Sequence, residues 1–253
     1  MDTNNGTKIK DILGRYPKGT VITAREMLSL GISRDLQRSF ERSGWLTRIG
    51  VGAYLVLGGE INLDKALRAM QAGLGLSIHV GGYTALHEKH GKTHNMPVFR
   101  KAELFAFRGE KIPSWFVSTF KNDCRIVHTS YLPRGLGLVD EYVDGFAVKI
   151  SSAERAIMEM IYLVPTVHSL RDVYQIMELL TVAKPALIDE LLGSCSSIKV
   201  KRLFLFMAEE AGHAWQKRLN TGKLNLGAGV RQIEKGGKLN RKYNIILGNI
   251  REI

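Results

Sequence analysis

The chain has 253 residues, of which 45% are hydrophobic and 24% charged, and its formal net charge is +12. These values are ordinary for globular proteins and leave enough chain for two domains. They exclude a small domain that needs disulfides to fold, and no apolar run approaches the roughly 18 residues of a membrane span, so we expect no membrane partner.

The first elements in chain order are two helices around a short extended segment. Apolar residues at helical spacing predict a helix over residues 9–16, and residues 21–22 can form a very short strand. Thr23 and Glu26 then have the spacing of a capping box, in which each side chain satisfies an amide at the start of a helix. This second helix is predicted to bury Met27, Leu28 and Leu30 and to end at Gly31.

A third helix and a hairpin follow. Ser33 is predicted to cap a helix over Arg34–Ser43, which Gly44 ends. Residues 45–57 read as two short strands around a glycine-containing tip, and Gly58-Gly59 marks a boundary.

The remainder mixes helices and strands. Strands are predicted at Ile78–Val80, Glu103–Phe107, Trp115–Val117, Arg125–His128, Phe146–Ile150 and within Val230–Ile250. Helices are predicted from Asn62 to Leu74 and at Tyr83–His90, Ser152–Leu163, Ser169–Leu180, Pro185–Leu192 and Lys199–Leu219.

The order of elements in residues 1–58, two short helices with a glycine at the turn and then a hairpin, predicts a winged helix-turn-helix. The second helix of such a pair enters the major groove with its N-terminal end first. Arginine can pair there with guanine and glutamine with adenine, whereas side chains further along the helix meet phosphates. We therefore predict DNA contacts for Arg34, Gln37, Arg38, Arg42 and, near the wing tip, Arg48.

The alternatives for this segment are a small helical subdomain with a solvated charged face, or a winged helix that contacts protein. Leu36 and Phe40, one turn apart, would pack the third helix onto the first two. The glycine turn, both caps, the hairpin and the local charge favour DNA.

Positive charge gathers at the two ends of the chain. Residues 1–58 hold nine Lys/Arg against five Asp/Glu, residues 59–198 fifteen against fifteen, and residues 199–253 twelve against four. A neutral middle between basic ends indicates two surfaces that face a polyanion, although basic faces also serve solubility. The C-terminal block could bind DNA backbone, RNA or an acidic protein, and we predict a secondary basic surface of Lys201, Arg202, Arg231, Lys238, Arg241 and Lys242.

No constellation of residues supports catalysis or a cofactor. His87, His90 and His94 follow one another closely, but Gly91 interrupts the helix and no cysteine is near, so we predict no metal. The glycine-rich segments lack phosphate-loop spacing, and no nucleophile motif or paired carboxylates stand out.

The two cysteines, Cys124 and Cys195, lie far apart in the chain and in no metal-binding pattern. They are best interpreted as small buried hydrophobic residues, and two lone thiols fit a reducing compartment. The polar start of the chain lacks the apolar core of a signal peptide. We therefore expect a cytoplasmic protein.

Several segments together resemble the AbiEi-type antitoxin family of abortive-infection, type IV toxin–antitoxin systems. They are the N-terminal winged helix that ends in Gly44–Tyr54, the run Gly81–His87, the run Lys149–Glu159 with its Ser-x-x-Glu-Arg-Ala pattern, and a closing hairpin at Gly237–Ile246. Each motif is short, and their common order carries the resemblance.

The resemblance implies two activities. The N-terminal domain would bind inverted repeats upstream of its own operon and repress it, with the DNA contacts at the five positions named above. The C-terminal domain would counter a nucleotidyltransferase-like toxin without forming a stable complex with it. The family supplies no small set of antitoxin residues to carry over to the C-terminal half.

We therefore predict an α+β protein with a winged helix at 1–58 and a mixed α/β domain at 59–253, acting as an autorepressor and antitoxin without catalysis. One alternative is a stand-alone transcription factor whose C-terminal domain senses a ligand or dimerises. Another is a nucleic-acid-processing enzyme, which needs an acidic metal-binding cluster that the sequence does not display.

Overall fold

The computed structural model describes residues 3–91 and 101–250. It mixes helices and strands, as the predicted α+β class requires. The chain divides into two compact units, each of which is described by itself. The first comprises Met1–His79, Gly109–Arg125 and Asp140–Lys149, and the second Val80–Arg108, Ile126–Val139 and Ile150–Ile253.

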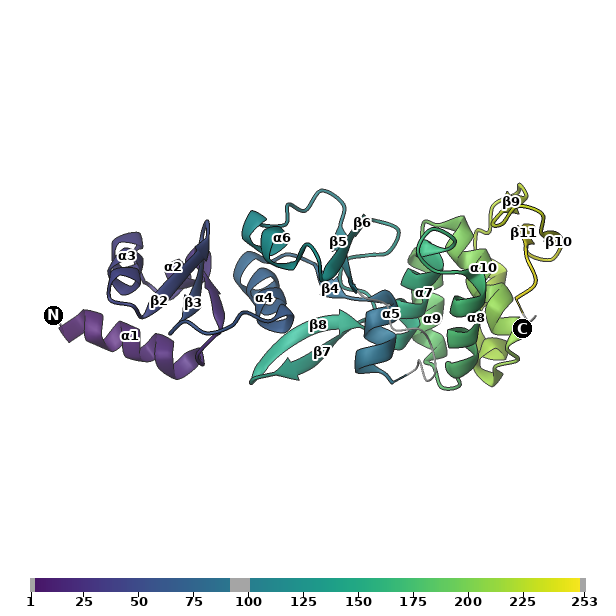
Figure 1. Cartoon of the computed structure of the whole chain (residues 1–253). Coiled ribbons are helices and arrows are strands. Elements are labelled where there is room, and N and C mark those ends of the chain that lie inside the picture. The colour runs from purple at the N-terminus through teal and green to yellow at the C-terminus, as the bar shows by residue number, and fades with distance from the viewer. Residues whose placement is uncertain (1–2, 92–100, 251–253) are drawn as a thin grey trace. The chain divides into compact units, whose positions relative to one another are not determined.

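The start of the first unit is a winged helix-turn-helix (Figure 1). Its three-stranded antiparallel sheet has the order β1-β3-β2. Both predicted caps are present, because the Thr23 hydroxyl accepts the Glu26 amide at 3.1 Å and the Ser33 hydroxyl accepts the Leu36 amide at 3.3 Å. Its elements are α1 (Thr3–Arg15), β1 (Val21–Thr23), α2 (Ala24–Ser29), α3 (Arg34–Arg42), β2 (Leu46–Gly50) and β3 (Ala53–Val56).

Only one half of the predicted capping box forms. Thr23 accepts the Glu26 amide, but the Glu26 side chain pairs with other groups. Its carboxylate accepts hydrogen bonds from the Tyr16 hydroxyl, at 3.0 Å, and from the Arg68 guanidinium. Arg68 is buried, and its guanidinium lies over the rings of Tyr16 and Phe146 at 5.0 and 4.8 Å. The buried Arg68 guanidinium needs the Glu26 carboxylate as its partner, because an unpaired buried charge is strongly destabilising. Leu28, predicted to face inward, is 45% exposed.

The first unit contains other helical segments besides the winged helix. They are α4 (Leu63–Arg68), the π-helical turn η1 (Ala69–Gly73) and α6 (Ser114–Phe120). The strand predicted at Trp115–Val117 is wrong, because Trp115, Phe116 and Phe120 bury one side of a helix that Pro113 begins. The three consecutive aromatic and β-branched residues of this segment, Trp115 to Val117, favour a strand when they are considered without their tertiary contacts.

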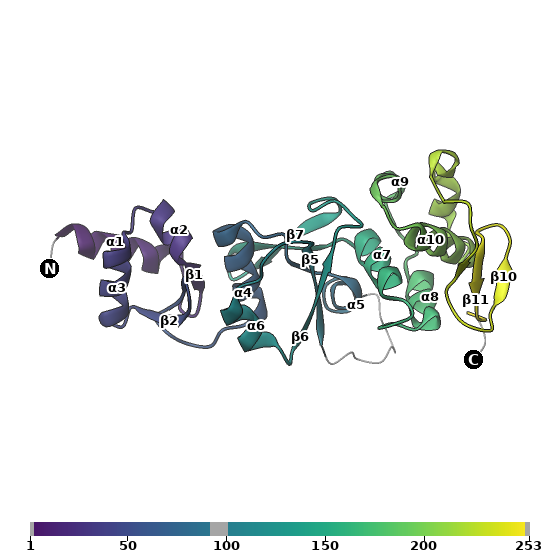
Figure 2. The same cartoon turned by 90° about the horizontal axis from the view of Figure 1, so that it is seen from above.

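Helices dominate the second unit, as Figure 2 shows. The predicted helix over Lys199–Leu219 is too long, because α10 stops at Glu210, before Gly212 at φ 68°. The unit's helices are α5 (Gly82–Thr84), which continues into the π-helical turn η2 (Ala85–Lys89), α7 (Ala153–Leu163), α8 (Leu170–Leu179), α9 (Pro185–Ser194) and α10 (Ile198–Glu210), followed by short 3-10 turns at Ala214–Arg218 and Thr221–Lys223.

The chain forms two further sheets. The larger has the order β6-β5-β4-β8-β7, with β4 and β8 parallel, and the smaller has the order β10-β11-β9. Strand β7 was not predicted from the sequence. The strands are β4 (His79–Val80), β5 (Ala102–Phe107), β6 (Cys124–Thr129), β7 (Leu138–Val143), β8 (Phe146–Ser151), β9 (Arg231–Gln232), β10 (Lys238–Asn240) and β11 (Ile245–Leu247).

A buried carboxylate joins the two central sequence motifs of the second unit. Glu159, which is fully buried, accepts hydrogen bonds from the Gly82 amide at 3.0 Å and the Ser151 hydroxyl at 2.7 Å. Its other oxygen accepts from Arg155 Nε at 2.8 Å, and Arg155 also donates to the Pro133 carbonyl. The run Lys149–Glu159 therefore anchors the start of α5 through Glu159, and Ser151 and Arg155 of its Ser-x-x-Glu-Arg-Ala pattern hold that carboxylate in place.

A second buried carboxylate, Glu103, receives the next amide of the same helix. It accepts from the Tyr83 amide at 2.9 Å, and His168 Nε2 lies 2.7 Å from its other oxygen. A side chain at Gly81 or Gly82 would overlap the Glu159 or Glu103 carboxylate, and Gly82 also has a φ of 51°. Glycine is thus required at positions 81 and 82, because the two carboxylates approach the start of α5 too closely to leave room for a side chain.

Among the residues that the structure describes, none of the helices has the length and apolar character needed to cross a bilayer.

Candidate nucleic-acid interface

Helix α3 carries a stripe of exposed arginines. Arg34, Arg38 and Arg42 are four residues apart and all exposed, so they follow one face of the helix from its first turn to its last. The opposite face buries Leu36 and Phe40 in the core of the winged helix, as predicted. Packing of that face fixes the orientation of the arginine stripe toward solvent.

Gln37 does not belong to this exposed face, so its predicted contact with adenine is corrected. Its side chain is 2% exposed, and its amide nitrogen donates to the carbonyls of Ile32, at 3.1 Å, and Ala24, at 3.3 Å. The position follows Leu36 directly on the buried side of α3, and its amide donates to one carbonyl at the start of α2 and to one in the turn between α2 and α3. Gln37 therefore fixes the angle between the two helices.

Two of the arginines predicted to contact DNA, Arg38 and Arg48, form weak contacts within the winged helix. Arg38 Nη1 lies 3.1 Å from Asp35 Oδ1, but both side chains are largely exposed, so the pair costs little to open. Arg48 is exposed on β2 and its Nε donates to the Gly50 carbonyl at 3.3 Å. These guanidinium groups can reach an anionic ligand without unfolding any part of the unit.

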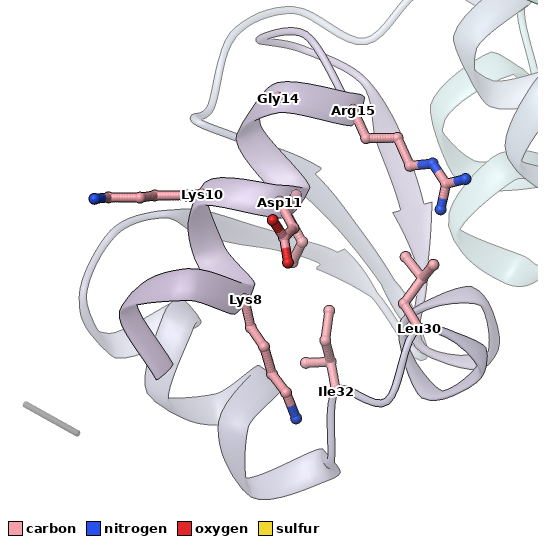
Figure 3. Close-up of a pocket in the computed structure, with 8 residues that line it drawn as sticks. Lys8, Lys10, Asp11, Gly14, Arg15, Leu30 and Ile32 are labelled. Carbon is pink, nitrogen blue, oxygen red and sulfur yellow. The ribbon is translucent and has the colours of Figure 1, made fainter. Parts of the chain in front are cut away.

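Helix α1 also carries basic residues. They contribute to the positive charge of residues 1–58 but were not predicted to contact DNA. Lys8, Lys10 and Arg15 border a cavity of about 510 Å³ between α1 and the turn before α3. Figure 3 shows the Asp11 side chain directed into this cavity and Lys10 directed away from it. Lys8 Nζ donates to the Gly31 carbonyl at 2.7 Å. The cavity thus offers mixed charges, and we assign no ligand to it.

Only some of the residues predicted to form a secondary basic surface in the C-terminal block are exposed. Arg231, Lys238 and Arg241 are exposed. Lys242 is also exposed but forms an ion pair with Glu209. Hydrogen bonds from Lys242 and then from Tyr243 lower the pKa of Glu209, so this carboxylate stays ionised at neutral pH.

Lys201 and Arg202 are buried and do not form part of any basic surface. Arg202, on α10, directs its guanidinium into the C-terminal tail and donates to four carbonyl oxygens at 2.6 to 2.9 Å, those of Leu226, Gly227, Gly229 and Asn244. Because its guanidinium donates to four backbone carbonyls, Arg202 fixes the conformation of the tail segment that contains them. A sequence-based charge count cannot separate this role from surface charge.

The residues considered for metal binding have other contacts. His87 stacks on Tyr83 with ring centroids 5.4 Å apart, and His90 Nε2 lies 2.8 Å from the Ser151 carbonyl. His94 lies outside the described residues. Within 3–91 and 101–250, no group of three or more His, Cys, Asp or Glu side chains is placed to hold a metal ion.

Both cysteines are buried, as the sequence predicted. Burial raises the pKa of the Cys195 thiol to about 11, so this thiol remains protonated and unreactive at neutral pH.

Comparisons with known proteins agree with this architecture. Residues 5–98 match the family model described as "Transcriptional regulator, AbiEi antitoxin N-terminal domain", and residues 100–248 match that described as "Transcriptional regulator, AbiEi antitoxin, Type IV TA system". No curated protein matches the chain. The solved structure of the RV2827C protein from Mycobacterium tuberculosis is similar in fold, with a TM-score of 0.58 and 12% identity over 96% of this chain and 91% of that one.

Proposed function

Because the chain belongs to the AbiEi antitoxin family of transcriptional regulators in type IV toxin–antitoxin systems, we propose that it represses its own operon by binding inverted repeats in the upstream DNA. In this proposal α3 enters the major groove and the wing contacts the backbone or minor groove. The same chain counters a nucleotidyltransferase-like toxin, and neither activity includes a catalytic step.

The observation that carries the DNA-binding proposal is the arginine stripe on α3. Arg34 and Arg38 lie in the first half of the helix, the part that meets base edges when such a helix enters the groove. In this orientation Arg42, one turn later, would contact a phosphate, and the exposed Arg48 would extend the contact to the wing. A stand-alone regulator would use the same surface, and the presence of a toxin gene beside this one distinguishes the two proposals.

The Arg38→Ala variant is expected to lose roughly 1–3 kcal/mol of binding free energy at the preferred site, and less on random DNA. The reason is that a bidentate arginine–guanine contact exists only at the correct base. Fluorescence anisotropy titrations of the full chain on both DNAs measure the difference. Equal loss on both DNAs would assign Arg38 to a phosphate, and no loss on either would contradict the proposed orientation of α3.

Gln37→Ala is the matched control on the neighbouring position. Because the Gln37 amide is used inside the fold, its removal leaves two carbonyls short of a donor and is expected to lower the free energy of unfolding by about 1–3 kcal/mol. Arg38→Ala should leave the free energy of unfolding within about 0.5 kcal/mol of the unmodified chain. Denaturant titrations of both variants separate a structural residue from a DNA-contacting one.

The antitoxin activity is proposed for the part of the chain that follows the winged helix. Its exposed basic residues, among them Arg231, Lys238 and Arg241, could meet an RNA, the backbone of DNA or an acidic partner. Co-expression with the toxin encoded beside this gene should restore growth, and the Arg38→Ala variant should restore it equally when both genes have a foreign promoter. Loss of rescue by Arg38→Ala under that promoter would contradict the separation of the two activities.

A further inference from the structure

The wing of the first unit has an irregular strand at the residue proposed to touch DNA. Strands β2 and β3 pair in antiparallel register, but the register shifts between Arg48 and Gly50, which is a bulge. Bulges of this kind bend a strand and redirect the side chains next to them. Here the Arg48 side chain folds back so that its Nε donates to the Gly50 carbonyl at 3.3 Å. The direction of Arg48 therefore depends on where the backbone of Gly50 lies.

Helix α6 fixes the position of Gly50. Trp115, which is 4% exposed, lies so close to Gly50 that a Cβ added there would overlap Trp115 Cβ and stand 3.2 Å from its Cγ. Trp115 is held in turn by an edge-to-face contact with Phe116, with ring centroids 5.9 Å apart. The φ of Gly50 lies outside the left-handed region, so close approach, and not backbone conformation, is what requires a glycine here.

The other side of the wing is tied to the helix-turn-helix itself. The Ala24 amide at the start of α2 donates to the Gly52 carbonyl at 2.8 Å. The short tip, with Val51 79% exposed, is thus held between α2 on one side and Trp115 on the other. A wing fixed at both sides presents Arg48 in one place relative to α3.

We propose that Trp115 is a positioning residue for the DNA contact of Arg48, acting through the backbone of Gly50. This inference rests on the proposed DNA-binding function. A wing whose backbone is already fixed loses less conformational freedom on binding, so a support that holds this backbone beforehand increases affinity without touching DNA. Trp115 lies 65 positions after Gly50 in the sequence, and the proposed function does not by itself involve α6.

A double-mutant cycle on the full chain tests the proposal. The variants are Trp115→Ala, Arg48→Ala and the two combined, and the measured quantity is the Kd for the chain's preferred DNA site at two salt concentrations. Arg48→Ala should weaken binding about tenfold and reduce the salt slope by about 1. Trp115→Ala should weaken binding roughly fivefold in the unmodified chain and less than about twofold when Arg48 is already alanine. Val117→Ala, exposed on the same helix, is the control and should bind like the unmodified chain.

Gly50→Ala tests the same Gly50–Trp115 contact from the side of the wing and leaves the buried Trp115 in place. It therefore tests the role of Trp115 even if Trp115→Ala fails to fold. Its added methyl group should displace the wing from Trp115 and weaken binding only when Arg48 is present. Equal weakening by Trp115→Ala or Gly50→Ala in both backgrounds, or no weakening in either, overturns the inference while leaving the proposed function intact. Absence of DNA binding by the unmodified chain overturns both.

Discussion

Glu159→Ala is expected to lower the free energy of unfolding by about 3–5 kcal/mol, because it leaves the buried guanidinium of Arg155 without its carboxylate. The variant also removes the acceptor of the Gly82 amide and of the Ser151 hydroxyl. For a domain whose total stability is about 5–15 kcal/mol, this loss is a large fraction. Thermal unfolding should show a midpoint lower by roughly 10 °C.

The control for Glu159 is Glu178→Ala on α8, where the side chain is exposed. Replacement of a solvated carboxylate should change the free energy of unfolding by less than about 0.5 kcal/mol. A second variant, Glu159→Gln, keeps the shape and one acceptor and should fall between the two. If Glu159→Ala and Glu178→Ala unfold at the same temperature, the proposed anchoring of α5 by the buried carboxylate is wrong.

Arg202→Met is expected to release the C-terminal tail from α10. The substitution keeps most of the side-chain volume but removes the arginine donor from the carbonyls of Leu226, Gly227 and Gly229, at a cost of at least about 3 kcal/mol. The Asn244 carbonyl loses one of its two donors and keeps the Arg231 amide. Limited trypsin digestion should therefore cleave within residues 223–242 while the helices before Glu210 stay protected.

Arg241→Met removes the same charge from an exposed position in that segment and is the matched control. It should leave the digestion pattern unchanged apart from the lost site. If trypsin leaves residues 223–242 uncut in the Arg202→Met variant, as in the unmodified chain, Arg202 is not needed to hold this segment. Arg202 and Arg241 thus separate a structural arginine from a surface one in a block that sequence reasoning treated as uniform.

The parts of the fold that the sequence predicts well are those set by local chemistry. Helix caps such as Ser33 act within one turn, and the glycine at the turn and the alternating wing strands lie within a few residues of their partners. The order of elements in the winged helix and the start of α7 at Ser152 follow from such signals. These segments need no knowledge of distant residues to be read correctly.

The errors arise where a distant residue decides the outcome. Glu26 leaves its expected amide because Arg68, 42 residues later, is buried beside it. Arg202 and Gln37 are polar residues that looked free for a ligand but satisfy buried carbonyls. Trp115 belongs to a segment whose composition favours a strand, yet it forms part of a helix against the wing. Burial of a polar group is a tertiary property, so periodicity alone cannot separate a ligand contact from an internal hydrogen bond.

The most direct test of the central claim is a gel-shift titration of the purified chain on the DNA immediately upstream of its own gene, with scrambled competitor, at two salt concentrations. We predict selective binding to the upstream DNA that weakens as salt rises, since the arginines of α3 and the wing displace counterions from phosphates. Binding with no preference over scrambled DNA would contradict the claim that the winged helix reads a sequence.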